Sequence, residues 1–326
     1  MNRRELITLL GGAAATWPVG AWAQQAGGRV WRIGMLETTS EVLNAANMTA
    51  FRQSLRSVGY VEHENYTIDY RSADGRSELF GSLVGELLLR GVDIVVARGT
   101  PATLAARSAS ATIPIVMTST AEPFAIVQSI AHPGGNVTGL SSMIADLTSK
   151  RLELLSDLLP RLSKVAMIID GRNPTMSSAY RGVETAAQAL KIEVLKFDVR
   201  KTDDLRPAFI AASTRRVDAM TMATETITQA NRQLIVQLAA EHRVPVIYSS
   251  REFVDAGGLI SLGVNYEDLY RRAALYVDKI FKGAKPADLP IEQPSKFELI
   301  VNLRAAKTLG IVVPPTLIAR ADEVIE

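Results

Sequence analysis

Short apolar runs rich in β-branched residues alternate along the whole chain with segments that carry apolar residues at helical spacing. The runs are brief and continuously apolar, which is typical of strands buried on both faces of a parallel sheet. This alternation predicts an α/β fold with parallel sheets. We interpret ten runs as strands: Trp31–Leu36, Tyr66–Tyr70, Asp93–Ala97, Pro114–Met117, Val137–Leu140, Lys164–Ile169, Glu193–Phe197, Ala219–Met222, Val246–Tyr248 and Leu259–Leu262.

Helical stripes of apolar residues fill the intervals between these runs. One stripe runs from Ala50 to Val58 and ends at Gly59, and a second stripe precedes Gly91. We interpret the stripes as faces that pack on the sheets rather than as cofactor-binding segments. Three further helices are expected over residues 147–159, 227–239 and 267–281.

The strands fall into two sets of five, which predicts two Rossmann-like domains rather than one very wide sheet. A length of 326 residues agrees with two domains of ordinary size. Breaks in the pattern indicate that the chain passes between the domains more than once; they fall at residues 139–145, 263–265 and 285–290. We therefore expect a first domain of residues 30–141 plus 264–290 and a second of residues 142–263 plus 291–326.

The first 23 residues have the composition of a signal peptide. Arg3 and Arg4 form a positive start, an apolar stretch follows, and Ala21-Trp22-Ala23 is an A-x-A cleavage signature. The adjacent arginines favour the twin-arginine export route, with an ordinary Sec signal as the alternative. We therefore expect the mature protein in a bacterial periplasm. No later segment of the sequence reaches membrane-spanning length without charge.

Composition excludes several classes of protein. The chain has no cysteine, so disulfide frameworks, zinc fingers, iron–sulfur clusters and lipidated-cysteine anchors are impossible. The 36 basic and 34 acidic residues leave a formal net charge of +2 without a basic cluster, which argues against nucleic-acid binding.

Sequence templates for catalysis and for cofactors are missing. No P-loop, no GxGxxG after the first strand and no GxSxG motif occurs. The three histidines, His63, His132 and His242, stand in unrelated contexts without metal-ligand spacing. We expect neither an enzyme nor a resident cofactor or metal.

Polar, hydroxyl-rich turns follow many of the expected strands. In parallel sheets, ligands bind beyond the carboxyl ends of the strands, and free N–H groups at helix starts suit an anionic group. The alternative for each turn alone is an ordinary helix cap. The candidates are Thr38, Thr39, Arg98, Gly99, Thr100, Thr118, Ser119 and Glu122 in the first half, and Asn173, Thr224, Ser250 and Arg251 in the second.

Long blocks of the chain resemble the substrate-binding proteins of ABC importers, in the branch that includes tryptophan- and tyrosine-binding members. The blocks span nearly the whole sequence: residues 50–71, 92–106 (VDIVVARGTPATLAA), 112–123, 132–142, 150–160 (KRLELLSDLLP), 251–261 and 285–315. The resemblance implies a type I periplasmic-binding-protein fold with hinge crossovers between the domains.

The resemblance also implies roles for particular residues. The family's GTP turn is present as Gly99-Thr100-Pro101, whereas Glu122-Pro123 replaces a usual Asp-Pro and Arg98 replaces a usually small residue. Arg98 offers a fork for a carboxylate, with a salt bridge to Glu122 or Glu37 as the alternative. Asn173 and Thr224 occupy positions where relatives use polar groups, and Tyr248, Arg251 and Tyr266 add stacking or charge.

The implied function is capture of a small carboxylate-bearing molecule, an amino acid or an aromatic acid, by domain closure. The implied partner is a transmembrane ABC permease, and we expect a monomer. A periplasmic sensing module that presents its ligand to a receptor or histidine kinase is the alternative. A transcription-factor effector domain of the same architecture would carry a helix-turn-helix segment, which is not visible in the sequence.

Overall fold

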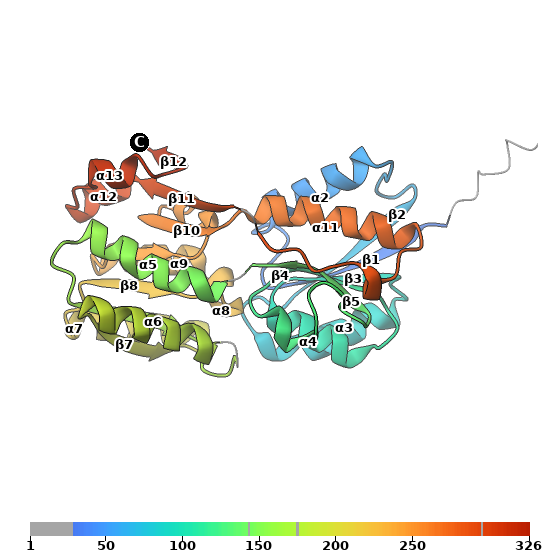
Figure 1. Ribbon diagram of the computed structural model, residues 1–326, viewed down its shortest axis with the longest axis horizontal. Helices are drawn as coiled ribbons and strands as arrows, with labels where there is room; N and C mark the ends of the chain where they lie inside the picture. The colour runs from blue at the N-terminus through green and yellow to red at the C-terminus, as the bar shows by residue number, and fades with distance from the viewer. Residues whose placement is uncertain (1–28, 143, 174–175, 295) are drawn as a thin grey trace, which may run out of the picture.

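Two mainly parallel sheets, each covered by helices on both faces, form two lobes that lie side by side (Figure 1). The computed structural model describes residues 29–142, 144–173, 176–294 and 296–326. The predicted α/β class is confirmed, whereas the signal peptide predicted for residues 1–23 lies outside the described residues. Among the described residues, no helix combines the length and apolarity needed to cross a membrane.

The first lobe is built on a five-stranded parallel sheet with the order β2-β1-β3-β4-β5. Helices α2 and α11 pack against each other on one face, and α3 and α4 cover the other (Figure 1). The strands are β1 Trp31–Glu37, β2 Tyr66–Ser72, β3 Ile94–Ala97, β4 Ile115–Thr120 and β5 Val137–Ser141. The helices are α2 Ala45–Ser57, α3 Phe80–Leu89, α4 Thr100–Ala109, α11 Tyr266–Phe281 and short 3₁₀ turns at Ser77–Leu79, Pro123–Ala125 and Pro286–Asp288.

The second lobe has a seven-stranded sheet with the order β12-β11-β10-β9-β8-β6-β7, in which β11 runs antiparallel to β10. The strands are β6 Lys164–Ile169, β7 Glu193–Asp198, β8 Ala219–Met222, β9 Val246–Tyr248, β10 Ile260–Val264, β11 Phe297–Asn302 and β12 Glu323–Ile325. The helices are α5 Ile144–Leu158, α6 Met176–Leu190, α7 Leu205–Thr214 (after a 3₁₀ turn at Thr202–Asp204), α8 Thr226–Ala230, α9 Arg232–Glu241, α10 Arg251–Asp255, α12 Leu303–Leu309 and α13 Pro315–Ile318.

All ten strands predicted from the sequence are present, and β11 and β12 are two that the sequence analysis did not predict. β12 is the edge strand of the second sheet, where burial is incomplete, and it begins with Glu323. β11 lies beside it, and only its first two residues, Phe297 and Glu298, are partly exposed. The helix expected over residues 227–239 is divided into α8 and α9 by Asn231.

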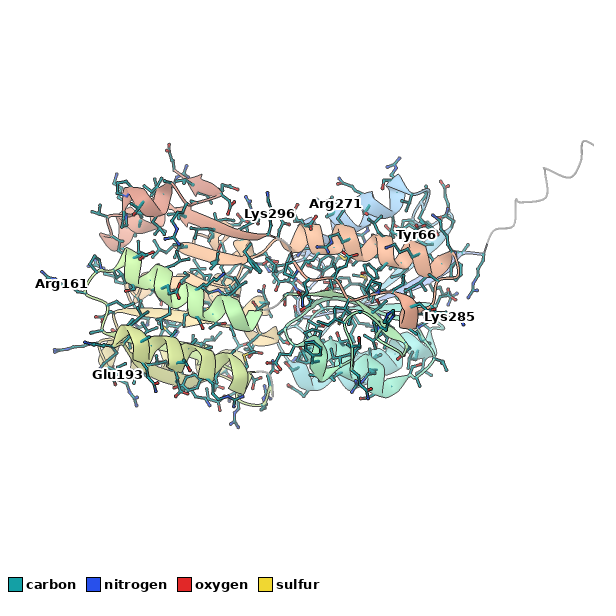
Figure 2. The ribbon with its side chains drawn as sticks, viewed as in Figure 1. Tyr66, Arg161, Glu193, Arg271, Lys285 and Lys296 are labelled. Atoms are coloured by element: carbon teal, nitrogen blue, oxygen red, sulfur yellow. The ribbon has the colours of Figure 1, made fainter. Side chains whose placement is uncertain are left out.

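The chain passes between the lobes three times, after β5, after β10 and before β11. The first and third passages lie side by side, since the Ser141 amide donates to the Glu292 carbonyl (2.9 Å). Val264 ends a strand of the second sheet, whereas Ile291 packs in the core of the first lobe. Figure 2 shows Arg271 and Lys296 near this junction, and Arg161 and Glu193 at the far end of the second lobe.

Gly139, in β5 close to the first passage, has no room for a side chain. Its φ is +124°, and a Cβ there would lie 2.2 Å from the Met117 carbonyl oxygen. We expect Gly139→Ala to lower the free energy of unfolding by about 3 kcal/mol or more, because strain and a backbone clash add. Denaturant titration checks this against Gly135→Ala, whose Cβ would meet nothing within 4 Å. Equal stability of the two variants would contradict the expectation.

Candidate functional site

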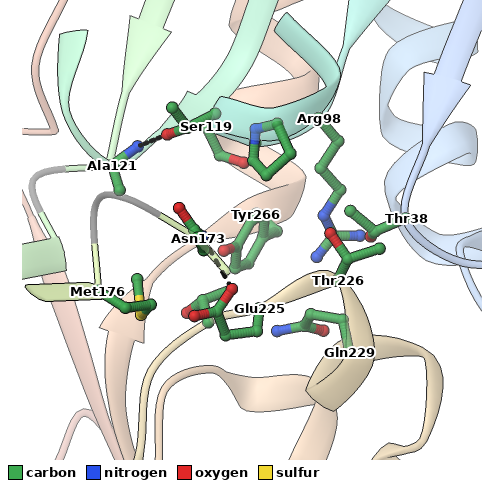
Figure 3. A pocket seen from close by; sticks show the side chains of 14 residues that line it. Thr38, Arg98, Ser119, Ala121, Asn173, Met176, Glu225, Thr226, Gln229 and Tyr266 are labelled. Atoms are coloured by element: carbon green, nitrogen blue, oxygen red, sulfur yellow. Dashed lines mark hydrogen bonds between the residues drawn. The ribbon is translucent and has the colours of Figure 1, made fainter. Parts of the chain in front are cut away.

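Loops from both lobes meet in a pocket between them (Figure 3). In the described conformation the cavity has a volume of about 30 Å³, so the two lobes leave little free space between them. It lies at the carboxyl ends of β1, β3 and β4 of the first sheet and of β6 and β8 of the second, where parallel sheets place their ligands. The two-sided lining suits a small molecule held by both lobes.

The first lobe supplies the start of α4 and the neighbouring turns. Gly99 precedes α4 with a φ of +86°, a backbone conformation that favours glycine. The first N–H groups of a helix have no intrahelical partner and carry partial positive charge. The Thr100 hydroxyl accepts from the Ala121 amide (3.3 Å), which ties this turn to the end of β4.

The second lobe supplies buried acceptors. Glu225 lies at the start of α8, and its Oε2 accepts from the Asn173 side-chain amide (2.9 Å; Figure 3). Among the described residues, Oε1 of Glu225 and Oε1 of Gln229 are buried without a hydrogen-bond partner. Burial raises the pKa of Glu225 to about 8, although the hydrogen bond from Asn173 opposes this. These two oxygens form a place for a donor that the protein itself does not provide.

Arg98 lies at the floor of the pocket with its charged group already engaged. It is only 2% exposed, and its guanidinium stacks over the Tyr266 ring at 4.3 Å from the centroid. Nη1 donates to Asn44 Oδ1 (3.1 Å), and Nη2 pairs with Glu252 Oε1 (3.1 Å). Because Glu252 belongs to α10, this ion pair joins the two lobes. The partner is thus neither of the two carboxylates, Glu122 and Glu37, that the sequence suggested.

A second buried carboxyl lies behind Arg98. The Tyr270 hydroxyl donates to Glu37 Oε1 (2.6 Å), and Glu37 is fully buried. Burial raises the pKa of Glu37 to about 7, because it outweighs the opposing effects of Arg98 and Tyr270. Burial also raises the pKa of Tyr270 well above its ordinary value.

These raised pKa values predict a pH dependence of stability. The pKa of Glu225 is about 8 in the folded protein and near 4.5 when unfolded. The folded state therefore binds the extra proton, so this stabilisation is complete below pH 4.5 and is lost as pH rises toward 8. The free energy of unfolding of the wild type should fall between pH 5 and 8 as the Glu225 carboxyl ionises. In Glu225→Gln we expect this slope to be smaller by up to about 1.4 kcal/mol per pH unit. Thermal and denaturant unfolding across this range check it, with exposed Glu193→Gln as the control; identical slopes in the two variants would refute it.

Further contacts close the cleft around the pocket. Arg232 of α9 donates to the Leu43 carbonyl (2.6 Å), and Arg172 lies 3.6 Å from Glu78. A Cβ at Gly75 would lie 3.2 Å from the Ala230 Cβ, so the lobes touch there. The described conformation is therefore one in which the two lobes contact each other across the cleft.

The pocket brings together eight of the candidate residues from the sequence: Thr38, Arg98, Gly99, Thr100, Ser119, Asn173, Thr224 and Tyr266. Six candidates lie outside it. Thr39 and Thr118 do so because neighbouring residues of an extended segment point in opposite directions, and Tyr248 packs in the core of the second lobe. The Thr39 carbonyl accepts from the Tyr70 hydroxyl, and Thr118 donates to the Ala97 carbonyl. Glu122 begins the 3₁₀ turn after β4.

Two further outside candidates lie at the start of α10. Ser250 precedes this helix and lies 3.3 Å from the Gln229 amide nitrogen. Arg251 pairs with Glu323 and Asp255 on the outer side. The sequence analysis did not include six lining residues among its candidates, Pro101, Ala121, Met176, Glu225, Thr226 and Gln229. Gln229 follows Glu225 by four residues, a spacing that places both on one helix face and could have identified it.

Comparison with known proteins gives consistent matches over most of the chain. Residues 39–325 match the family model described as ABC transporter substrate binding protein. A protein of Clostridioides difficile (strain R20291) named "Tyrosine-binding protein" is 26% identical over 263 residues, which cover 80% of this chain and 75% of the relative.

Two solved structures share the fold. A conserved domain protein from Vibrio cholerae O1 biovar El Tor superposes with a TM-score of 0.84 at 24% identity, covering 91% of this chain and 100% of that one. The ABC domain from Streptococcus pneumoniae in complex with L-Trp gives a TM-score of 0.82 at 24% identity, with the same coverage. These likenesses agree with the two-lobed fold described above.

Proposed function

The chain belongs to the family of ABC transporter substrate-binding proteins, and on this premise we propose that it captures an aromatic amino acid in the cleft for an ABC importer. Substrate-binding proteins of ABC transporters are extracellular or periplasmic. We propose export to the periplasm, by the twin-arginine route, and delivery by a monomer to a transmembrane permease. The choice of ligand rests on two acceptors in the pocket, Oε1 of Glu225 and Oε1 of Gln229, which have no partner among the described residues.

The acceptors favour a ligand with an ammonium group. Oε1 of Glu225 and Oε1 of Gln229 lack partners among the described residues, and both side chains line the pocket. A buried acceptor without a donor is unfavourable, and an ammonium group supplies three donors. An amino acid fits this requirement, whereas a simple aromatic acid has no donor of this kind.

Apolar groups favour an aromatic side chain on that amino acid. Pro101, Met176 and the Tyr266 ring line the pocket, and a neighbouring hollow shares Pro101 and Asn173 with it. The names of the relatives support this choice, since one is named for tyrosine binding and another was solved with L-Trp.

Closure is the proposed mechanism of capture. A ligand that touches Thr100 of the first lobe and Glu225 of the second stabilises the closed form more than the open one. Arg98 takes part in closure through its pair with Glu252, so we assign it to the contact between lobes rather than to the ligand's carboxylate. The permease then recognises the closed surface.

Calorimetric titration tests the proposed ligand class. We expect L-tryptophan or L-tyrosine to bind with a Kd of about 1 μM or tighter, and indole-3-propionate, which lacks the ammonium group, to bind at least about 100-fold more weakly. Equal binding of the acid and the amino acid would contradict the assignment of Glu225 and Gln229. Absence of binding by both amino acids would contradict the aromatic ligand class.

A further inference from the structure

Arg151, on α5, is a buried cation that the closed cleft does not use. The side chain is 0% exposed, and its Nε donates to the Leu262 carbonyl (2.8 Å). In the described part of the chain, neither Nη1 nor Nη2 has a hydrogen-bond partner, and no carboxylate interacts with the guanidinium. Burial lowers the pKa of Arg151 to about 10. A guanidinium has five N–H donors, so most of its donor capacity is unmet.

Its position places it near the pocket. Helix α5 packs on β8 and β10, and Leu262 lies in β10 near the cleft end of the second sheet. β8 leads into Thr224, which lines the pocket. Tyr266, another lining residue, is close enough to Arg151 to interact electrostatically with it.

Two buried hydroxyls lie on the same face of the sheet. Thr221 lies two positions from Ala219 in β8 and two from Ala223 just after it, so the three side chains share one face of the sheet. Ala219 and Ala223 pack in the core to which α5 contributes, so Thr221 also faces α5. Ser249 follows β9 and is on the same side as Ile247. Within the described residues, the hydroxyls of Thr221 and Ser249 have no hydrogen-bond partner.

A comparison with Arg98 shows that Arg151, Thr221 and Ser249 lack a negatively charged partner. Arg98 is equally buried, but Glu252 supplies its counter-charge. A buried cation without a counter-charge is strongly unfavourable, and groups of this kind cluster at functional sites where a ligand completes them. A zwitterionic ligand whose ammonium group meets Glu225 also carries a carboxylate, and the guanidinium of Arg151 offers that carboxylate charged donors.

We propose that Arg151, with Thr221 and Ser249, forms the subsite that receives the carboxylate of the ligand. This inference rests on the proposed amino-acid function. Tyr266 belongs to α11, which packs on α2 in the first lobe, whereas Arg151 and Thr224 belong to the second. We therefore expect separation of the lobes to move Tyr266 away from Arg151 with the first lobe and to give a ligand access to Arg151 from the cleft.

The test compares Arg151→Met and Arg151→Lys with the wild type and with Arg320→Met. Arg320 is an exposed arginine of the same lobe that pairs with Asp157, so its variant controls for the loss of a charge. We expect R151M to bind L-tryptophan or L-tyrosine about 100-fold more weakly and to bind L-tryptophanamide as the wild type does. We expect ligand-free R151M to unfold at a temperature no lower than the wild type, because an unpaired buried charge is removed. R151K is expected to retain binding within about tenfold.

Two results would overturn the proposal: normal amino-acid binding by R151M, or a lower unfolding temperature of R151M that R151K restores, which would make the arginine structural. If the wild type binds neither amino acid, the proposed function fails and sodium acetate tests the subsite separately. Acetate should raise the unfolding temperature of the wild type and R320M but not of R151M. Equal stabilisation by sodium chloride at the same ionic strength would overturn the assignment to a carboxylate, as would no effect of acetate.

Discussion

Replacing Arg98 by methionine is expected to weaken binding of the amino-acid ligand by about 100-fold, through loss of the closed form. Closure brings Glu252 against Arg98. Without the arginine this carboxylate enters the contact without its paired cation and keeps only the hydrogen bond from Asn47 (3.2 Å) with the first lobe. Truncating one partner of a buried charge pair costs about 2–5 kcal/mol. Because the Glu252 side chain is 17% exposed, we expect an effect near 2–3 kcal/mol, the lower part of that range.

A double variant separates this role from direct contact with the ligand. In Arg98→Met combined with Glu252→Gln, the unpaired carboxylate is gone, so most of the lost affinity should return. If Arg98 instead held the ligand's carboxylate, the double variant would bind no better than the single one. Calorimetry of the four proteins in the cycle measures the coupling between the two side chains directly.

The substitution Glu225→Gln is expected to have the second large effect, on proton release and on affinity for the ligand. At pH 7 a carboxyl with a pKa of about 8 is mostly protonated, and an arriving ammonium group favours its charged form. Binding of L-tryptophan or L-tyrosine to the wild type is therefore expected to release close to one proton per ligand. Glu225→Gln should release far fewer protons and bind about 30- to 100-fold more weakly.

Titrations in buffers of different ionisation enthalpy measure this proton release. Glu193→Gln is the matched control, since Glu193 is exposed at the far end of the second lobe (Figure 2). The same proton release by Glu225→Gln and by the wild type would show that the ammonium group binds elsewhere. Glu37, whose pKa is about 7, would then be the next group to exchange for glutamine.

The fold was largely predictable because buried parallel strands leave continuous apolar runs. The runs at Trp31 and Lys164 are examples, and both begin strands at the predicted positions. The edge strand β12 was not predictable in this way, since Glu323 opens a run of only three residues that are half-buried. Exposure at a sheet edge removes the pattern on which the prediction depends.

The site was predictable only to the level of its loops. The rule that ligands bind at strand ends located Thr38, Gly99 and Thr224, but it does not say which way each side chain of a loop points. The Arg98–Glu252 pair could not be predicted from the sequence, because the two residues are 154 positions apart and only the arrangement of the lobes brings them together. The burial of Arg151 could have been predicted from the local sequence, because it shares a helix face with Leu147 and Leu155, which are both buried.

Mass spectrometry of the protein purified from a periplasmic extract tests the central claim most directly. Under native conditions, the account predicts a population whose added mass equals one small molecule, and denaturation should release that molecule as an unmodified aromatic amino acid. Release of a compound without an ammonium group, or of a chemically altered product, would contradict the account.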